Sequence, residues 1–198
     1  TNGGMNMHPF LHALNEGVLL GDGAMGTMLQ TAGLPRGEMP ERWMKDNPDA
    51  ILEIHRAYVM AGASILETNT FGANPFKLKE YDLDSMTREL NILGAELARK
   101  AATPDCFVAG IIGPCGFFPA PLSPYSFEAI KDAFKIQVEC LLEGGVDLFL
   151  LQTFSDLGEA RAALLAVREL CDLPVGVSMT YGTHQRTLTG SDAKTVAT

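Results

Sequence analysis

The sequence predicts an α/β fold in which short apolar strands alternate with helices around a parallel sheet. Three apolar segments run directly into polar residues or glycines: residues 18–20 precede a glycine-rich loop, residues 64–66 precede Glu67, and residues 148–151 precede Gln152. Enzymes built from repeated β/α units place their sites at the carboxyl ends of the strands. This pattern favours a β/α barrel, and a doubly wound sheet is the alternative that it leaves open.

Five strands are expected, at residues 18–20, 64–66, 107–112, 148–151 and 175–179. Their continuous apolar character fits a parallel sheet that is covered on both faces. A complete barrel of eight β/α units usually needs about 250 residues, whereas this chain has 198. The sequence therefore predicts about the first five units of such a barrel.

Four helices are expected between these strands, over residues 48–61, 85–101, 127–143 and 157–170. Asn47 followed by Pro48 is typical of an N-cap and a first helical position. Ser126 is expected to cap the third helix. Residues 156–159 are expected to form a capping box at the start of the fourth helix.

Composition and charge exclude several classes of partner. The chain is 46% hydrophobic and 20% charged, which is ordinary for a globular domain. Its formal net charge is −9, and no basic cluster exceeds two residues, so neither a nucleic acid nor an anionic membrane is an expected partner. No apolar run approaches the roughly 20 residues that span a bilayer.

The four cysteines form no C-x-x-C pair and match no zinc-finger spacing, so free thiols in a reducing compartment are expected. Residues 1–9 are interpreted as a leader or a remnant preceding the fold, and residues 10–198 as one domain. Residues 1–9 lack the charged and apolar regions of a signal peptide, which favours the cytoplasm.

Several motifs, in order, resemble those of the homocysteine S-methyltransferase family. They are LGDGAMGTML at residues 20–29, Asn47-Pro48 with Ile54-His55, AGA at 61–63, ETNTFGAN at 67–74, Gly113-Pro114 and TFSD at 153–156. The resemblance covers about residues 11–190. Within the family, the chain is most similar to the homocysteine-binding modules of cobalamin-dependent members and of members fused to a folate reductase.

The resemblance implies a TIM barrel that methylates the thiol of homocysteine to give methionine. Zinc holds that sulfur as a thiolate, which is the nucleophilic form. The methyl donor would be methylcobalamin or a methyl-onium compound such as S-methylmethionine. The three zinc-binding cysteines of the family have no counterpart in this sequence, so we expect the metal ligands beyond Thr198 and neither a metal ligand nor a catalytic residue within the chain.

By the same resemblance, Asp22 would accept a hydrogen bond from the substrate's ammonium group, and Gly23 would let the backbone approach its carboxylate. An acid among glycines also suits a ligand amine on chemical grounds alone. Gln152 stands where the family usually has a glutamate as second acceptor. It keeps one acceptor oxygen and loses the charge.

Glu67, Thr68 and Asn69 are expected to line the mouth of the pocket, with pairing of Glu67 to a basic residue of a neighbouring strand as the alternative. Cys115 follows the third strand without a nearby histidine or cysteine, so we expect a structural thiol. His55 is expected to have a surface or packing role, and His184 to lie in a loop.

Two other functions stay open. The chain could be a catalytically incomplete fragment or subunit that needs a partner chain, or the acceptor could be a different thiol. An unpaired edge at the fifth strand would favour self-association. A cobalamin- or folate-binding module is a further expected partner. A lyase with a Schiff-base lysine is disfavoured because Lys77 and Lys79 are predicted outside the strands.

Overall fold

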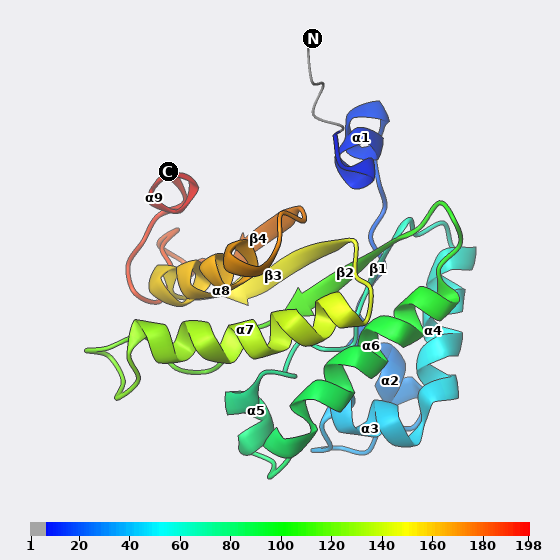
Figure 1. The fold of residues 1–198 in the computed structure, drawn as a ribbon, viewed down its shortest axis with the longest axis horizontal. Coiled ribbons are helices and arrows are strands. Elements are labelled where there is room, and N and C mark those ends of the chain that lie inside the picture. Colours follow the sequence, from blue (N-terminus) through cyan, green and yellow to red (C-terminus); the bar gives the residue numbers. More distant parts are fainter. Residues whose placement is uncertain (1–6) are drawn as a thin grey trace.

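The computed structural model describes residues 7–198. Within them, four strands form one sheet of order β1-β2-β3-β4 in which every pair is parallel (Figure 1). The strands are β1 (Ile65–Glu67), β2 (Phe107–Ile112), β3 (Leu148–Phe154) and β4 (Val175–Met179). Sequential strands that are neighbours in a parallel sheet are the arrangement of a β/α barrel wall.

The prediction of a first strand at residues 18–20 is wrong. The segment joins the sheet through a single parallel bridge between Gly21 and Ile65. The Leu20 carbonyl accepts from the backbone N–H groups of Ser64 and Ile65, and the Asp22 N–H donates to the Ile65 carbonyl. A strand needs a longer ladder than this, and the glycine-rich loop turns away immediately, so four strands and one bridge replace the five predicted strands.

The four predicted helices are present as α4 (Pro48–Met60), α6 (Thr87–Ala101), α7 (Phe127–Glu143) and α8 (Leu157–Leu170). They pack side by side in this order and cover one face of the sheet (Figure 1). Shorter helices not predicted from the sequence are α1 (Pro9–Glu16), α2 (Met25–Thr31), α3 (Pro40–Asp46), α5 (Pro75–Lys79) and α9 (Ala193–Ala197), with a 3₁₀ turn at Asp84–Met86.

The capping predictions are confirmed in part. Ser126 Oγ accepts from the Ala129 N–H, and Asp156 Oδ1 accepts from the Glu159 N–H at 2.7 Å. The Glu159 side chain does not complete a capping box, because its Oε1 accepts from the Cys115 N–H at 2.6 Å instead. The amide of Asn47 donates to the Trp43 carbonyl of the preceding helix rather than capping α4.

Successive side chains of the strands point to opposite faces of the sheet and are buried on both, as expected for a sheet that is covered on both sides. Val108 and Ile112 of β2 belong to the large core between the sheet and helices α4 to α8. Ala109 and Ile111 of the same strand pack on the other face together with Phe10 of α1. This second cluster places α1 on the face of the sheet opposite helices α4 to α8, where the Phe10 ring contacts Phe107 at the start of β2.

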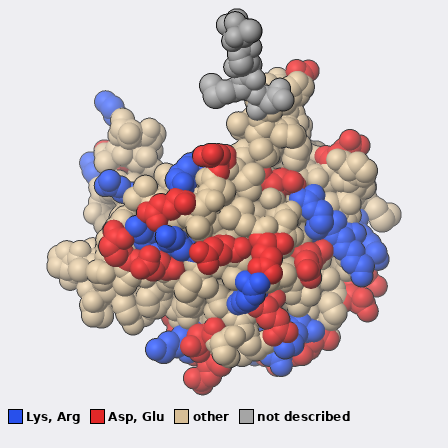
Figure 2. All heavy atoms as spheres, viewed as in Figure 1, with Lys and Arg blue, Asp and Glu red and all other residues tan. Residues whose placement is uncertain are grey.

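The predicted leader falls mainly on residues 1–6, which lie outside the described residues. Of the remainder, His8 caps α1 through its Nδ1 and Pro9 is the first residue of that helix. No helix within residues 7–198 is long and apolar enough to cross a membrane. On the face drawn in Figure 2, lysine and arginine side chains are interspersed with aspartate and glutamate.

Candidate functional site

The six predicted site residues line one cavity of about 370 Å³ at the carboxyl end of the sheet. Asp22 and Gly23 come from the loop after the Gly21 bridge, Glu67 ends β1, and Gln152 lies in β3. The other predicted residues around the cavity are Thr68 and Asn69, and its wall is completed by Ala24, Met25, Phe71 and Ile111. The fold therefore brings together segments that lie up to 130 residues apart in the sequence, counting from 22 to 152.

Asp22 forms the floor of the cavity, and its side chain is only 1% exposed. Its Oδ2 accepts the backbone N–H of Glu67 at 3.0 Å. Its Oδ1 has no hydrogen-bond partner among the described residues. Burial raises the pKa of Asp22 to about 7, and the nearby charge of Glu67 acts in the same direction. The site therefore contains a buried carboxyl group with one oxygen that no described residue satisfies.

Gly23 lies in close approach to a tyrosine side chain and has no unusual backbone angle. A Cβ atom at this position would lie 2.8 Å from Tyr58 Oη, which is closer than real Cβ contacts. The Tyr58 hydroxyl donates to the Ala24 carbonyl at 3.3 Å. The loop is thus held against α4 by the Tyr58 hydroxyl, and a side chain at position 23 would require Tyr58 to move.

Glu67 and Gln152 are joined across the sheet by a hydrogen bond of 2.8 Å from Gln152 Nε2 to Glu67 Oε1. Burial raises the pKa of Glu67, while this bond lowers it. The alternative in which Glu67 pairs with a basic residue is wrong, because its partner is the neutral amide. Its negative charge is therefore not neutralised by that partner.

Thr68 and Asn69 line the cavity but use their side chains to hold the loop after β1. Thr68 Oγ1 accepts from the Ile111 N–H at 2.9 Å and shares a hydrogen bond of 2.6 Å with Thr70 Oγ1. Asn69 Nδ2 donates to the Pro40 carbonyl at 3.0 Å. Both side chains shape the cavity and connect it to β2 and α3.

His55 is a site residue that the sequence did not predict. It is fully buried in α4, with its Nδ1 3.9 Å from Asp22 Oδ2. Neither ring nitrogen has a hydrogen-bond partner among the described residues. Burial lowers the pKa of His55 to about 4, so its imidazole is neutral at physiological pH. A surface position is excluded, whereas the packing role is consistent with this burial. Two signals pointed to this residue: Ile54-His55 is among the motifs shared with the family, and His55 lies three residues before Tyr58, which places both on one face of the helix.

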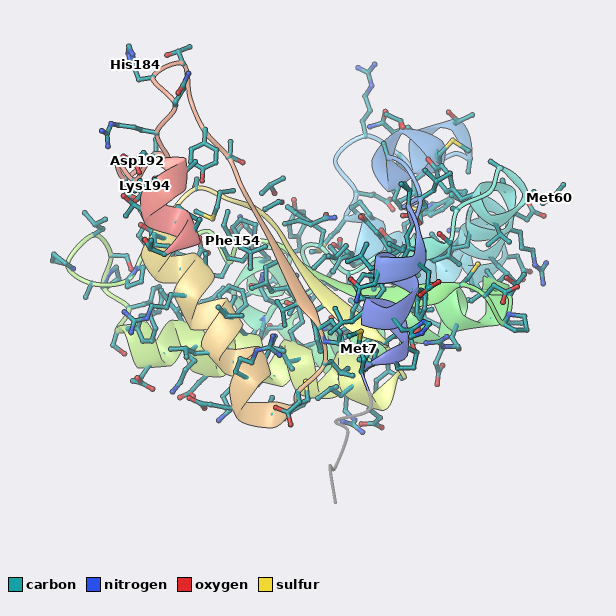
Figure 3. The ribbon with its side chains drawn as sticks, turned by 90° about the horizontal axis from the view of Figure 1, so that it is seen from above. Met7, Met60, Phe154, His184, Asp192 and Lys194 are labelled. Carbon is teal, nitrogen blue, oxygen red and sulfur yellow. The ribbon has the colours of Figure 1, made fainter. Side chains whose placement is uncertain are left out.

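The two remaining candidates, Cys115 and His184, do not line the cavity that contains Asp22. Cys115 is fully buried, and burial raises the pKa of its thiol well above the ordinary value, with Glu159 beside it adding to the shift. A structural role for this thiol fits that environment. Figure 3 shows His184 at the tip of the terminal loop, and its side chain is exposed.

The residues present do not fit a zinc ion. Across residues 7–198, no three His, Cys, Asp or Glu side chains converge in a way that could hold a metal. All four cysteines are free thiols, and three of them are buried. We therefore assign no metal ligand within the described chain.

A parallel β/α sheet with a cavity at the carboxyl ends of its strands, lined by a buried acid whose Oδ1 has no hydrogen-bond partner among the described residues, is the arrangement of a β/α-barrel protein with a candidate ligand site at that edge. The chain belongs to the homocysteine S-methyltransferase family, whose model matches residues 19–198. The resemblance found in the motifs is thereby confirmed.

Two curated relatives are methionine synthases of Mycobacterium leprae and Mycobacterium tuberculosis, each 35% identical. The matches cover 94% and 92% of this chain, respectively. The chain spans only 17% of the length of either relative.

Among solved structures, the chain is similar to the homocysteine methyltransferase MmuM from Escherichia coli. The oxidized form matches with a TM-score of 0.82 and 26% identity, covering 96% of this chain and 72% of that one. The metallated form matches with a TM-score of 0.81 and 26% identity, covering 95% and 72%. The predicted partial β/α barrel is confirmed by this likeness.

Proposed function

We propose that this chain, from residue 10 to 198, is the part of a homocysteine S-methyltransferase barrel that binds the amino-acid end of homocysteine. The observation that carries the proposal is Asp22 Oδ1, a buried acceptor without a partner among the described residues, at the floor of the cavity. A buried polar atom without a partner is costly, and an ammonium group offers three donors to satisfy it.

In this proposal the substrate's ammonium donates to Asp22 Oδ1 and is also attracted by Glu67. Since Gln152 Nε2 is engaged by Glu67, its carbonyl oxygen is the acceptor that Gln152 can offer. Gly23 leaves room for the substrate's carboxylate near the backbone. The positive ammonium favours the ionised form of Asp22, so binding near neutral pH would release a proton from this residue.

We propose that zinc is held by groups other than the described residues, because those residues do not fit it. The metal would supply a homocysteine thiolate, and no residue described here takes part in that step. The relatives named methionine synthase support methyl transfer to homocysteine as the overall reaction. Methylcobalamin as donor, a cobalamin- or folate-binding module as partner, and a cytoplasmic location are further parts of this proposal.

Calorimetric titration of the intact protein with homocysteine tests the proposal. The comparison ligand is 4-mercaptobutanoate, which keeps the thiol and the carboxylate but lacks the ammonium. We expect homocysteine to bind more tightly in the wild type, and Asp22→Asn to remove that preference. Equal binding of the two ligands by the wild type would contradict an ammonium site, and binding of a different amino thiol in preference to homocysteine would point to another acceptor.

A second proposal concerns self-association of the 198-residue chain through β4. Within residues 7–198 this strand pairs only with β3, and its Val177 side chain is 45% exposed. Exposed edge strands promote pairing with another chain. Sedimentation velocity should detect oligomers of this chain, and a compact monomer at all concentrations would contradict the proposal.

A further inference from the structure

Three buried polar atoms without hydrogen-bond partners lie in one place beneath the cavity. They are Asp22 Oδ1 and the two ring nitrogens of His55, and no described residue satisfies them. The two side chains are 1% and 0% exposed, respectively. Buried polar groups in native proteins are almost always paired, so a cluster of this kind needs an explanation.

The geometry of the pair is close to a hydrogen bond but does not form one. His55 Nδ1 lies 3.9 Å from Asp22 Oδ2, and the same oxygen already accepts the Glu67 N–H at 3.0 Å. A hydrogen bond needs a distance of about 3 Å, so a movement of about 1 Å by the imidazole would complete it. The carboxylate would then be fixed by two donors on Oδ2, with Oδ1 still free.

Helix α4 contacts the Asp22 loop through a second side chain one turn further on. Tyr58 packs against Gly23, and its hydroxyl donates to the Ala24 carbonyl. His55 and Tyr58 therefore present one face of α4 to the loop, as residues three apart on a helix do. The imidazole is thus held by a rigid element beside a loop that is anchored on both sides of Asp22.

We propose that His55 is a positioning residue for Asp22: in the homocysteine-bound protein its Nδ1–H donates to Asp22 Oδ2 and keeps Oδ1 directed to the substrate's ammonium. This inference rests on the proposed function. Because the buried imidazole is neutral, it orients the carboxylate without adding a positive charge that would oppose the ammonium. A protonated histidine or a lysine at this place would neutralise Asp22.

The test uses the intact protein and measures dissociation constants for homocysteine and 4-mercaptobutanoate by calorimetry. We expect His55→Leu to weaken homocysteine binding by roughly tenfold or more, because a hydrogen bond to a charged group is lost, and to leave 4-mercaptobutanoate binding unchanged. His55→Asn should recover most of the affinity, since its side-chain N–H replaces Nδ1–H. His55→Gln, whose N–H replaces that of Nε2, should not.

Equal loss of affinity for both ligands in His55→Leu would overturn the proposal, as would no loss for either. If His55→Leu fails to fold by circular dichroism, the comparison between His55→Asn and His55→Gln decides, and equal homocysteine affinity in these two variants would overturn it. Failure of the proposed function has a different signature, because the wild type itself would then not prefer homocysteine to the analogue lacking the ammonium.

Discussion

Gln152 Nε2 donates a hydrogen bond of 2.8 Å to Glu67 Oε1, and this contact connects β3 to β1 across the intervening β2. Because the Gln152 amide is neutral, it donates this hydrogen bond without neutralising the Glu67 carboxylate. The cavity therefore keeps Glu67 beside the buried acid Asp22, and the charge of Glu67 adds to the rise in the pKa of Asp22.

Exchanging the side chains of Glu67 and Gln152 tests whether one acid and one amide are needed at these two positions. Gln152→Glu alone places two carboxyl groups at hydrogen-bond distance, so they must share a proton and the protein should lose stability above about pH 6. The double variant Glu67→Gln with Gln152→Glu restores one acid and one amide, and we expect most of the stability to return. Thermal unfolding at pH 5 and pH 8 measures both effects. An equal loss at the two pH values would contradict the electrostatic explanation.

Asp22→Asn should stabilise the unliganded protein at high pH. Asp22 has its pKa raised by burial from 3.8 to about 7, so the folded state binds this proton more tightly and stability is lost as the pH rises from about 4 to 7. The variant avoids that loss, and we expect a gain on the order of 2 kcal/mol at pH 8, or roughly 4–8 °C in melting temperature.

The gain should shrink as the pH falls toward 4 and vanish below about pH 3, where Asp22 is protonated in both the folded and the unfolded state. His55, whose pKa is lowered from 6.5 to about 4, removes stability as the pH falls through that range. That loss is common to the wild type and the variant, so the difference between their melting temperatures reports on Asp22. A difference that does not change with pH would contradict the raised pKa.

Gly23→Ala should destabilise the protein by about 0.5–1 kcal/mol, because its Cβ would lie 2.8 Å from Tyr58 Oη and would displace this hydroxyl from the Ala24 carbonyl. Gly26→Ala is the matched control, since no atom lies within 4 Å of a Cβ at that position in α2. We expect the control to be neutral or slightly stabilising. Denaturant unfolding measures both variants, and equal effects would rule out the close approach as the reason for Gly23.

Thiol labelling should distinguish the four cysteines. Cys115 is fully buried with its pKa strongly raised by burial, and it should stay unmodified by a maleimide in the native protein. Cys171 is only partly buried and should react first. Mass spectrometry of peptides after a short reaction gives the order. Early labelling of Cys115 would indicate a reactive thiol at the site.

The sequence alone determined the alternation of four strands with the long helices α4, α6, α7 and α8, because apolar periodicity, Ser126, Asp156 and the glycines mark the ends of these elements through local interactions. It also predicted Asp22, Glu67 and Gln152 at the carboxyl ends of strands; Glu67 does end β1, Asp22 follows the Gly21 bridge, and Gln152 lies in the last part of β3, which runs on to Phe154. Parallel strands bring these positions to one edge of the sheet. The cavity that these residues share follows from that rule.

Only the tertiary structure decided which groups meet. The burial of His55 beneath Asp22, the bond of Glu159 to Cys115 in place of a capping box, and the amide partner of Glu67 all join segments far apart in the chain. The strand predicted at residues 18–20 is absent because strand formation also depends on pairing with a distant segment. These residues are apolar, but the segment pairs with β1 through the single Gly21–Ile65 bridge only. Local patterns determine how a segment can fold, whereas pairing and burial depend on neighbours that packing alone supplies.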